Sequence, residues 1–397
     1  MIQPIYINTK EQQYDTWNIQ GQTLLDLNQY QEAISCYDKA ISINSKIESA
    51  WNGKEAIGCY NEAILINAKF DQALINKGQA LYKLKQYHEA IQCYNEAISI
   101  NPNQSSVWHK KGYKLLNVNI GLGLFNLKNY QEAVKCYNSA IAINPNQSSV
   151  WNNKGLALYN LKQYQDAIQC YNEAIAINPN YSSAWNNKGL GLFNLKNYQE
   201  AVKCYNQSIA INPQYDTAWN NLGSALEKLK QYEEAIASYD EAIYINPDYS
   251  AAWYNKGLAL YNMKQYQDAI QCYNEAIAIN PQFGTAWNNK GSALYYLNQY
   301  QEAIKCYNEV ISFNPNYFIA WYNKGNALKN LKQYQEAIEC YDVTISINPK
   351  YVEAYENKGL ILHSLQKFMD ALTNFEKALQ LKHNALRFQF KGKFFYY

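Results

Sequence analysis

GLGLFNLKNYQEAVKCYN fills residues 121–138 of this chain, and the same letters fill residues 189–206. The two copies begin 68 residues apart, which is twice 34. A unit of 34 residues is visible in the positions of the aromatic residues that recur at this spacing, namely Trp151, Trp185, Trp219, Trp253, Trp287, Trp321 and then Tyr355. Self-similarity at a fixed period indicates a stacked array, because a single unit cannot bury its apolar face alone.

Each unit is predicted to be two helices joined by a polar turn. In one unit the second helix carries a wide apolar stripe at helical spacing, formed by Ala167, Ile168, Cys170, Tyr171, Ala174 and Ile175. Trp151, Gly155 and Leu158 form a second stripe upstream. Pro179 ends the second helix, because proline lacks an N–H and disfavours helical geometry in the residue before it. Small residues stand where the two helices must approach closely.

This pattern, W-x3-G, then A-x3-Y-x2-A, then P, resembles the tetratricopeptide repeat. The resemblance implies an all-α fold, a right-handed α-solenoid (superhelix) of stacked helix-turn-helix hairpins with a period of 34 residues. It covers residues 14–385 in about 11 units, between an N-terminal lead, 1–13, and a basic-aromatic tail, 386–397. One departure is a lysine where the family usually has leucine, at Lys154, Lys188, Lys256, Lys290, Lys324 and Lys358. We expect these side chains to reach the helix rim while their stems cover apolar surface.

Two units break the rhythm, either as real features or as errors in the gene model. The unit at 48–70 is shortened and predicts a break in the stacking there. The unit at 105–147 is lengthened, and we expect a kink or a loop at 113–121 because the added residues would rotate the apolar stripe around the helix. The tail 386–397 is expected to fold back on the last hairpin and bury its aromatic residues, with membrane or partner docking as the alternative.

Composition bears on the location and on the chemistry. Lys and Arg number 35 against 33 Asp and Glu, so no excess positive charge predicts binding to nucleic acid. No signal-like start and no long apolar run is visible, which predicts a cytoplasmic protein without a membrane span. The cysteines share one buried slot, listed as Cys36, Cys59, Cys93, Cys136, Cys170, Cys204, Cys272, Cys306 and Cys340. They predict core packing in a reducing compartment and not disulfides, and serine in their place is expected to destabilise the fold.

No residues predict catalysis, a metal site or a cofactor. The four histidines share no slot and no ligand spacing with cysteine, and few residues lie outside the array. We therefore expect a protein that is not an enzyme.

One constellation predicts binding. In this family the first helix of each hairpin lines the concave wall, and two residues after the aromatic slot stand Asn76, Asn153, Asn187, Asn221, Asn255, Asn289, Asn323 and Asn357. One heptad later on the same helices come Asn160, Asn194, Asn262 and Asn330. Amide side chains both donate and accept hydrogen bonds, so a solvent-facing row could pair with the backbone of an extended peptide. Similar asparagine ladders line O-linked N-acetylglucosamine transferases. The alternative is that asparagine is simply frequent in this sequence.

These features predict a non-catalytic scaffold that binds proteins or peptides, most readily unstructured segments, in the concave groove. The alternative is the recognition arm of a larger enzyme, such as an O-linked N-acetylglucosamine transferase-like glycosyltransferase. Heat-shock chaperone C-termini are not expected as partners. The basic clamp that would hold their carboxylate is absent from the corresponding slots, which read Ser149, Ser183, Thr217, Ala251 and Thr285.

Overall fold

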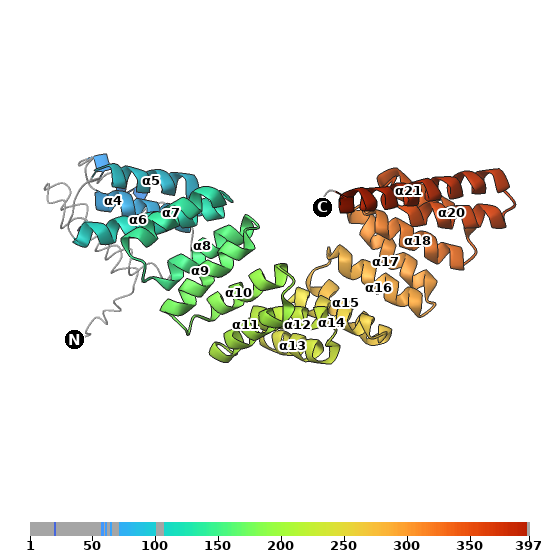
Figure 1. Cartoon of the computed structure of the whole chain (residues 1–397), viewed down its shortest axis with the longest axis horizontal. Coiled ribbons are helices and arrows are strands. Elements are labelled where there is room, and N and C mark those ends of the chain that lie inside the picture. Colours follow the sequence, from blue (N-terminus) through green and yellow to red (C-terminus); the bar gives the residue numbers. More distant parts are fainter. Residues whose placement is uncertain are drawn as a thin grey trace, which may run out of the picture. The chain divides into compact units, whose positions relative to one another are not determined.

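The computed structural model describes residues 71–100 and 107–394, together with positions 20, 57, 58, 60, 61, 64 and 65. At 107–116 and 384–394 it describes the helical backbone without the side chains. The described elements are all α-helices (Figure 1). The first helices of the hairpins are α4 Asp71–Lys83, α6 Val107–Asn126, α8 Ser148–Asn160, α10 Ser182–Asn194, α12 Asp216–Lys228, α14 Ser250–Asn262, α16 Gly284–Tyr296, α18 Phe318–Asn330 and α20 Val352–Ser364. The second helices are α5 Tyr87–Ile100, α7 Tyr130–Ile143, α9 Tyr164–Ile177, α11 Tyr198–Ile211, α13 Tyr232–Ile245, α15 Tyr266–Ile279, α17 Tyr300–Phe313, α19 Tyr334–Ile347 and α21 Phe368–Phe394.

Consecutive helices pack against one another within two compact units, residues 1–197 and 198–397. This arrangement confirms the predicted all-α solenoid of helical hairpins. In each unit the first helices also approach the first helices of the neighbouring hairpins, as α8 does with α10 and α14 does with α16. The second helices show no comparable approach to one another in the described part of the chain. The first helices therefore line the inner side of each stack.

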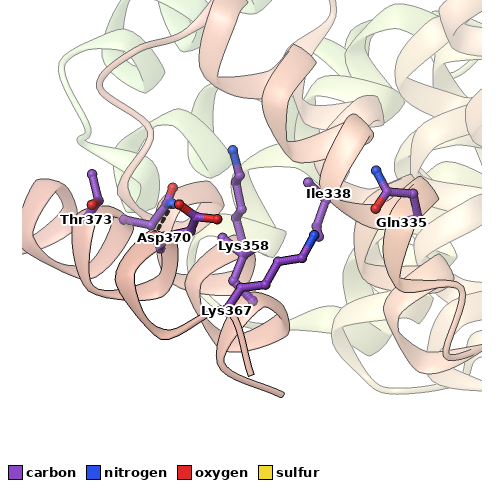
Figure 2. Close-up of a pocket in the computed structure, with 8 residues that line it drawn as sticks. Gln335, Ile338, Lys358, Lys367, Asp370 and Thr373 are labelled. Atoms are coloured by element: carbon purple, nitrogen blue, oxygen red, sulfur yellow. Dashed lines mark hydrogen bonds between the residues drawn. The ribbon is translucent and has the colours of Figure 1, made fainter. Parts of the chain in front are cut away.

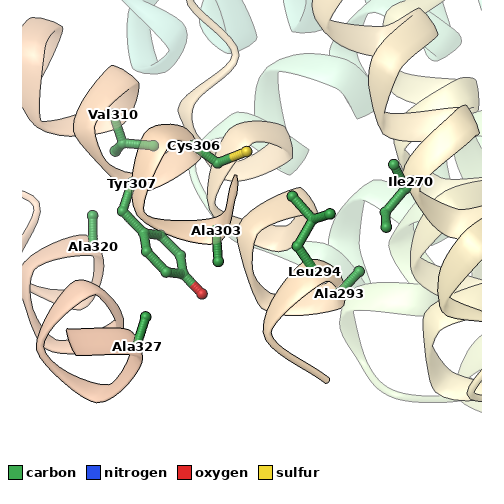
Figure 3. Packing of buried hydrophobic residues seen from close by; sticks show 9 residues of the cluster. All are labelled: Ile270, Ala293, Leu294, Ala303, Cys306, Tyr307, Val310, Ala320 and Ala327. Carbon is green, nitrogen blue, oxygen red and sulfur yellow. The ribbon is translucent and has the colours of Figure 1, made fainter. Parts of the chain in front are cut away.

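The core of each described hairpin except the last is built on a buried tyrosine of the second helix, and Phe375 takes this place in α21. The ring of Tyr171 lies against Gly155, where an added Cβ would come within 2.5 Å of the tyrosine Cε1 atom. This confirms the prediction that the glycine permits close helix packing. In the cluster shown in Figure 3, the ring of Tyr307 lies between Ala303 of its own helix and Ala320 and Ala327 of the next hairpin.

The tryptophans and prolines recur with the same 34-residue period, and a hydrogen bond links each described pair of them. The indole Nε1–H of Trp151 donates to the carbonyl oxygen of Pro145 at 2.8 Å, and Trp253 donates to that of Pro247 at 3.0 Å. Tyr355, which replaces tryptophan, makes the equivalent bond through its hydroxyl to Pro349, at 3.3 Å. The aromatic slot therefore holds the loop between hairpins as well as contributing apolar surface.

The turn inside each hairpin has a left-handed residue that the sequence did not reveal. Lys162 has a φ of 62°, its N–H donates to the carbonyl of Tyr159, and the N–H of Gln163 donates to that of Leu158. These two bonds are the Schellman ending of a helix, which glycine usually provides because it has no Cβ. Lysine recurs at this position, with Asn298 and Gln366 as exceptions.

The lengthened unit does not form the loop that was one of its two predicted outcomes, and the alternative, a kink in the helix, stays a prediction. No loop interrupts 113–121, because α6 runs unbroken from Val107 to Asn126. Its 20 residues exceed the usual 13 by seven, which is close to two helical turns and keeps the apolar stripe in phase. Gly121 packs on Tyr137, so Asn117, four residues before it, occupies the aromatic slot.

The tail prediction is also wrong. α21 continues as one helix to Phe394, so residues 386–394 extend the second helix and do not fold back as a separate segment. The shortened unit at 48–70 lies almost entirely outside the described residues, so its predicted break in stacking stays a prediction.

The cysteines of the described part behave as core residues. None of them forms a disulfide with a described residue; Cys136 is half-buried, and the buried ones are Cys93, Cys170, Cys204, Cys272, Cys306 and Cys340. Burial raises the pKa of Cys170 to about 11. Ser238 occupies the same slot in one hairpin, is buried, and donates to the carbonyl of Glu234 at 2.8 Å. The Ser238 hydroxyl can be buried because the helix backbone supplies a carbonyl oxygen as its hydrogen-bond acceptor. The destabilisation expected when serine replaces the cysteines of the other hairpins stays a prediction.

The unusual lysines reach the rim of the helix as predicted. The Nζ atom of Lys154 lies 5.1 Å from the ring centroid of Trp151, and that of Lys290 lies 5.0 Å from the Trp287 ring. Lys256 adds an ion pair with Asp240, with a distance of 2.6 Å between Nζ and Oδ1. A cation over an indole face is attracted by the ring quadrupole, which gives lysine a reason to stand at this position.

Candidate functional site

The row of asparagines two positions after the aromatic slot does not stand open to solvent. Asn187 is buried, and Asn76, Asn153, Asn221, Asn255, Asn289, Asn323 and Asn357 are half-buried. The prediction that these side chains face solvent in the groove therefore fails for Asn187, whereas the half-buried members keep part of their surface exposed. Whether any of them contacts a ligand stays a prediction.

The amides of this row bond one first helix to the preceding one. Asn187 donates from Nδ2 to Oδ1 of Asn152 at 2.9 Å. The equivalent distances are 3.0 Å from Asn255 to Asn220 and 3.1 Å from Asn323 to Asn288. Where a tyrosine replaces the acceptor, its hydroxyl accepts instead, as Tyr254 does from Asn289 at 3.1 Å and Tyr322 does from Asn357 at 2.9 Å. We call these bonds the inter-repeat ladder.

The second row of asparagines is more accessible. Asn160, Asn194, Asn262 and Asn330 are all exposed, and we call them the exposed row. Asn194 donates to the hydroxyl of Tyr159 at 2.8 Å and Asn330 donates to that of Tyr295 at 2.8 Å.

The hydrogen bond to a tyrosine hydroxyl is absent at Asn160, and the row has one further member, Asn126. Asn160 follows Phe125, which has no hydroxyl, and its amide donates to Leu156 of its own helix at 2.8 Å. Asn126 donates to the hydroxyl of Tyr82 at 2.9 Å and belongs to the same row. Sequence spacing alone does not place Asn126 in this row, because the lengthened unit obscures the register of its helix.

A third column of the first helices lies eight positions after the aromatic slot. It is aromatic in most described hairpins, with Tyr82, Phe125, Tyr159, Phe193, Tyr261 and Tyr295. Glu227 and Lys329 interrupt this aromatic column with opposite charges, and both are half-buried. Burial raises the pKa of Glu227 and lowers that of Lys329. The sequence contained this signal, which becomes visible when equivalent positions of the hairpins are compared.

A pocket of about 250 Å³ lies between α19, α20 and α21, and Figure 2 shows Gln335, Lys358 and Asp370 among its lining residues. Lys358 forms an ion pair with Asp342, so its charge is already matched. In the described part of the chain, no three His, Cys, Asp or Glu side chains are placed to hold a metal ion. Nor does any described helix have the length and apolar character needed to cross a membrane.

The repeating hairpins, with glycine packed on tyrosine and tryptophan bonded to the proline loop, define a helical-repeat solenoid. The chain belongs to the tetratricopeptide repeat family. The tetratricopeptide repeat model matches residues 14–47, 72–104, 148–181, 182–215, 217–249, 250–283, 284–317 and 318–351. Further repeat models match residues 121–162 and 352–384. No curated protein matches the sequence.

Solved structures share the fold at low sequence identity. The APC/C hetero-tetramer Cut9-Hcn1 aligns with a TM-score of 0.50 and 15% identity over 88% of this chain and 76% of that one. MamA aligns with a TM-score of 0.41 and 24% identity, covering 42% of this chain and 97% of its own. YrrB, described as a TPR protein with an unusual peptide-binding site, aligns with a TM-score of 0.40 and 19% identity over 47% of this chain and 96% of its own.

Proposed function

We propose that the chain is a non-catalytic scaffold that binds extended segments of other proteins along the inner side of its first helices. The observation that carries this proposal is the exposed row. Asn160 and Asn194 in one compact unit, and Asn262 and Asn330 in the other, present amide groups at the same position of the first helices α8, α10, α14 and α18, whereas Lys228 and Tyr296 take this position on α12 and α16. An extended peptide has an N–H and a C=O at every residue, and an amide side chain can pair with either.

The two asparagine rows would then have different roles. The inter-repeat ladder uses its Nδ2 groups to join neighbouring first helices, which keeps the helices at a constant spacing. The exposed row stands outward from this support and makes the ligand contacts. A rigid support favours binding, because less freedom is lost when the ligand is ordered.

The affinity of such a surface is expected to be modest. Each amide-to-peptide hydrogen bond contributes about 0.5–1.5 kcal/mol net, since water competes for the same groups in the free state. Ordering an unstructured peptide lowers the affinity further, so dissociation constants of about 1 µM or weaker are expected. The same surface would serve equally in the recognition arm of a larger enzyme, and no observation on the described residues favours that alternative.

The test begins with a phage-displayed library of random peptides selected on the full chain. Selected peptides are then titrated against the chain with Asn160, Asn194, Asn262 and Asn330 replaced by alanine. Affinity should fall by about 30- to 10,000-fold if the hydrogen-bond contributions add.

The matched control replaces four exposed asparagines on the second helices, Asn172, Asn206, Asn274 and Asn308. This control removes the same number of exposed amide groups from the second helices, on the outer side of each stack. It should leave the affinity for the peptide unchanged. A library that yields no binder, or an equal loss of affinity in both quadruple variants, would overturn the proposal.

A further inference from the structure

Two opposite charges stand in the aromatic column of residues 198–397. Along α12, α14, α16 and α18 the column reads Glu227, Tyr261, Tyr295 and Lys329. The two charged residues are 102 positions apart, which is three repeats of 34. They therefore lie on the same side of first helices that follow one another in this unit.

Glu227 is a half-buried carboxylate without an ion-pair partner among the described residues. Its Oε2 atom accepts a hydrogen bond from the hydroxyl of Tyr239 at 3.4 Å, which is long for this type of bond. Burial raises its pKa, which shows that the charged form is poorly compensated in the free protein. A cationic group of a ligand would therefore stabilise the charged form of this half-buried carboxylate.

Lys329 is the counterpart of opposite sign. Its Nζ donates to Oδ1 of Asn357 at 2.8 Å, and it forms no ion pair with a described residue. Burial lowers its pKa, because the ammonium group has lost water without gaining an anion. An ammonium group has three donors, so Lys329 can bind a carboxylate while keeping its bond to Asn357.

Between the two charges lies a cluster of tyrosines. The rings of Tyr266 and Tyr296 are stacked, with centroids 5.1 Å apart and planes 8° from parallel. The ring centroids of Tyr261 and Tyr295 each lie 5.9 Å from that of Tyr296, both in an edge-on arrangement. Tyr296, which replaces the asparagine of the exposed row, is 56% exposed. Exposed aromatic faces of this kind favour contact with apolar or proline side chains.

We propose that the face formed by α12, α14, α16 and α18 selects extended peptides that carry a basic side chain for Glu227 and an acidic side chain for Lys329. Apolar or proline residues of the peptide would lie between them on the tyrosine cluster. The proposal rests on the proposed function and adds the chemistry of the ligand.

The order of the first helices gives an expected spacing of the two charges. Neighbouring packed helices lie about 8–10 Å apart, so three steps from α12 to α18 span about 24–30 Å. An extended chain rises about 3.3 Å per residue, so the basic and acidic residues should be about seven to nine positions apart.

The experiment starts from peptides selected on the full chain, as above, and reads their sequences. Enrichment of one basic and one acidic residue at this separation, with apolar residues or proline between them, is the expected result. A parallel selection on the variant that carries Glu227→Lys and Lys329→Glu should enrich the same pair in reversed order along the chain. Binders with no charge pair in the first selection would overturn the inference while leaving the proposed function intact.

Titrations with one selected peptide test each contact. Glu227→Gln should weaken binding by about 10- to 100-fold, and Lys329→Gln should do the same, because each removes a charge-assisted bond. Replacing the basic residue of the peptide by an uncharged one of similar length should have no further effect on Glu227→Gln. Additive losses in this cycle would mean that the two groups do not meet, which would refute the assignment.

Matched controls are Glu241→Gln and Lys350→Gln, which remove the same charges from exposed positions off this face. Both should bind the peptide with wild-type affinity. If these controls weaken binding as much as Glu227→Gln and Lys329→Gln, the effect is one of net charge, and the inference fails.

Discussion

The inter-repeat ladder makes a testable claim about stability, which the substitution of Asn187 by alanine addresses directly. Asn187 is 8% exposed and donates to Oδ1 of Asn152, which is 4% exposed, at 2.9 Å. The alanine variant removes the donor and leaves the oxygen of Asn152 buried without this bond. A buried polar group left in that state costs about 1–3 kcal/mol, and the free energy of unfolding should fall by this amount.

The assay is denaturant unfolding of the full chain, followed by far-ultraviolet circular dichroism in the absence of any ligand. Because a repeat array unfolds through nearest-neighbour interactions, the curves should be fitted with a term for each interface. The loss should appear in the interface between α8 and α10. Asn160→Ala is the control, since Asn160 is exposed and its amide donates within its own helix. It should change stability by less than about 0.5 kcal/mol.

A double-mutant cycle with Asn152→Ala separates the bond from other effects. The two substitutions should be coupled by about 0.5–3 kcal/mol, because the second removes the oxygen that the first leaves without its donor. Wild-type stability of Asn187→Ala would refute the structural role of the ladder. If that variant also lost peptide affinity, Asn187 would instead be a ligand contact.

Four further predictions follow from single contacts. An added Cβ at Gly257 would lie 2.7 Å from Cε1 of Tyr273, so Gly257→Ala should lower the free energy of unfolding by about 1–3 kcal/mol, measured with denaturant. Gly284→Ala is the control and should lower it clearly less, because its Cβ would lie 3.2 Å from the partly exposed Phe313. Tyr171→Phe should leave the free energy of unfolding unchanged or raise it, because the Tyr171 hydroxyl has no hydrogen-bond partner among the described residues. Tyr341→Phe should lower it by about 0.5–1.5 kcal/mol, because it removes a 2.8 Å hydrogen bond to Asn326. Equal effects of the two substitutions would contradict this prediction. Burial raises the pKa of Cys170 and Cys340 to about 11, so at about pH 8 roughly one thiol in a thousand is ionised, and alkylation by iodoacetamide should be about 100-fold slower than in the unfolded chain. Burial raises the pKa of Glu227, so its contribution to stability is present below the unfolded pKa and is lost as pH rises through the folded pKa. Glu227→Gln should therefore raise the melting temperature at about pH 7 but not at about pH 3. An equal shift at both pH values would count against this prediction.

The fold could be predicted from the sequence, because the periodicity and the packing positions are encoded within each unit. Trp151, Gly155, Tyr171 and Pro179 mark the two helices, their close approach and the end of the hairpin. Stacking of equivalent units then follows, because each hairpin can bury its apolar face only against a neighbour. The predicted cysteine positions and the lysines at the helix rim agree with the structure for the same reason, as both depend on position within one helix.

The tertiary structure decided what joins one hairpin to the next and what stays open to a ligand. The bond from Asn187 to Asn152 connects residues 35 positions apart, and no pattern within a single helix reveals whether an amide is used there or is free. The unbroken helix α6 depended on its total length of 20 residues and not on the size of the insertion. Glu227 and Lys329 became a candidate recognition pair only when their burial and their lack of an ion pair with any described residue were known, because a charge on a first helix is ordinary until its surroundings exclude water.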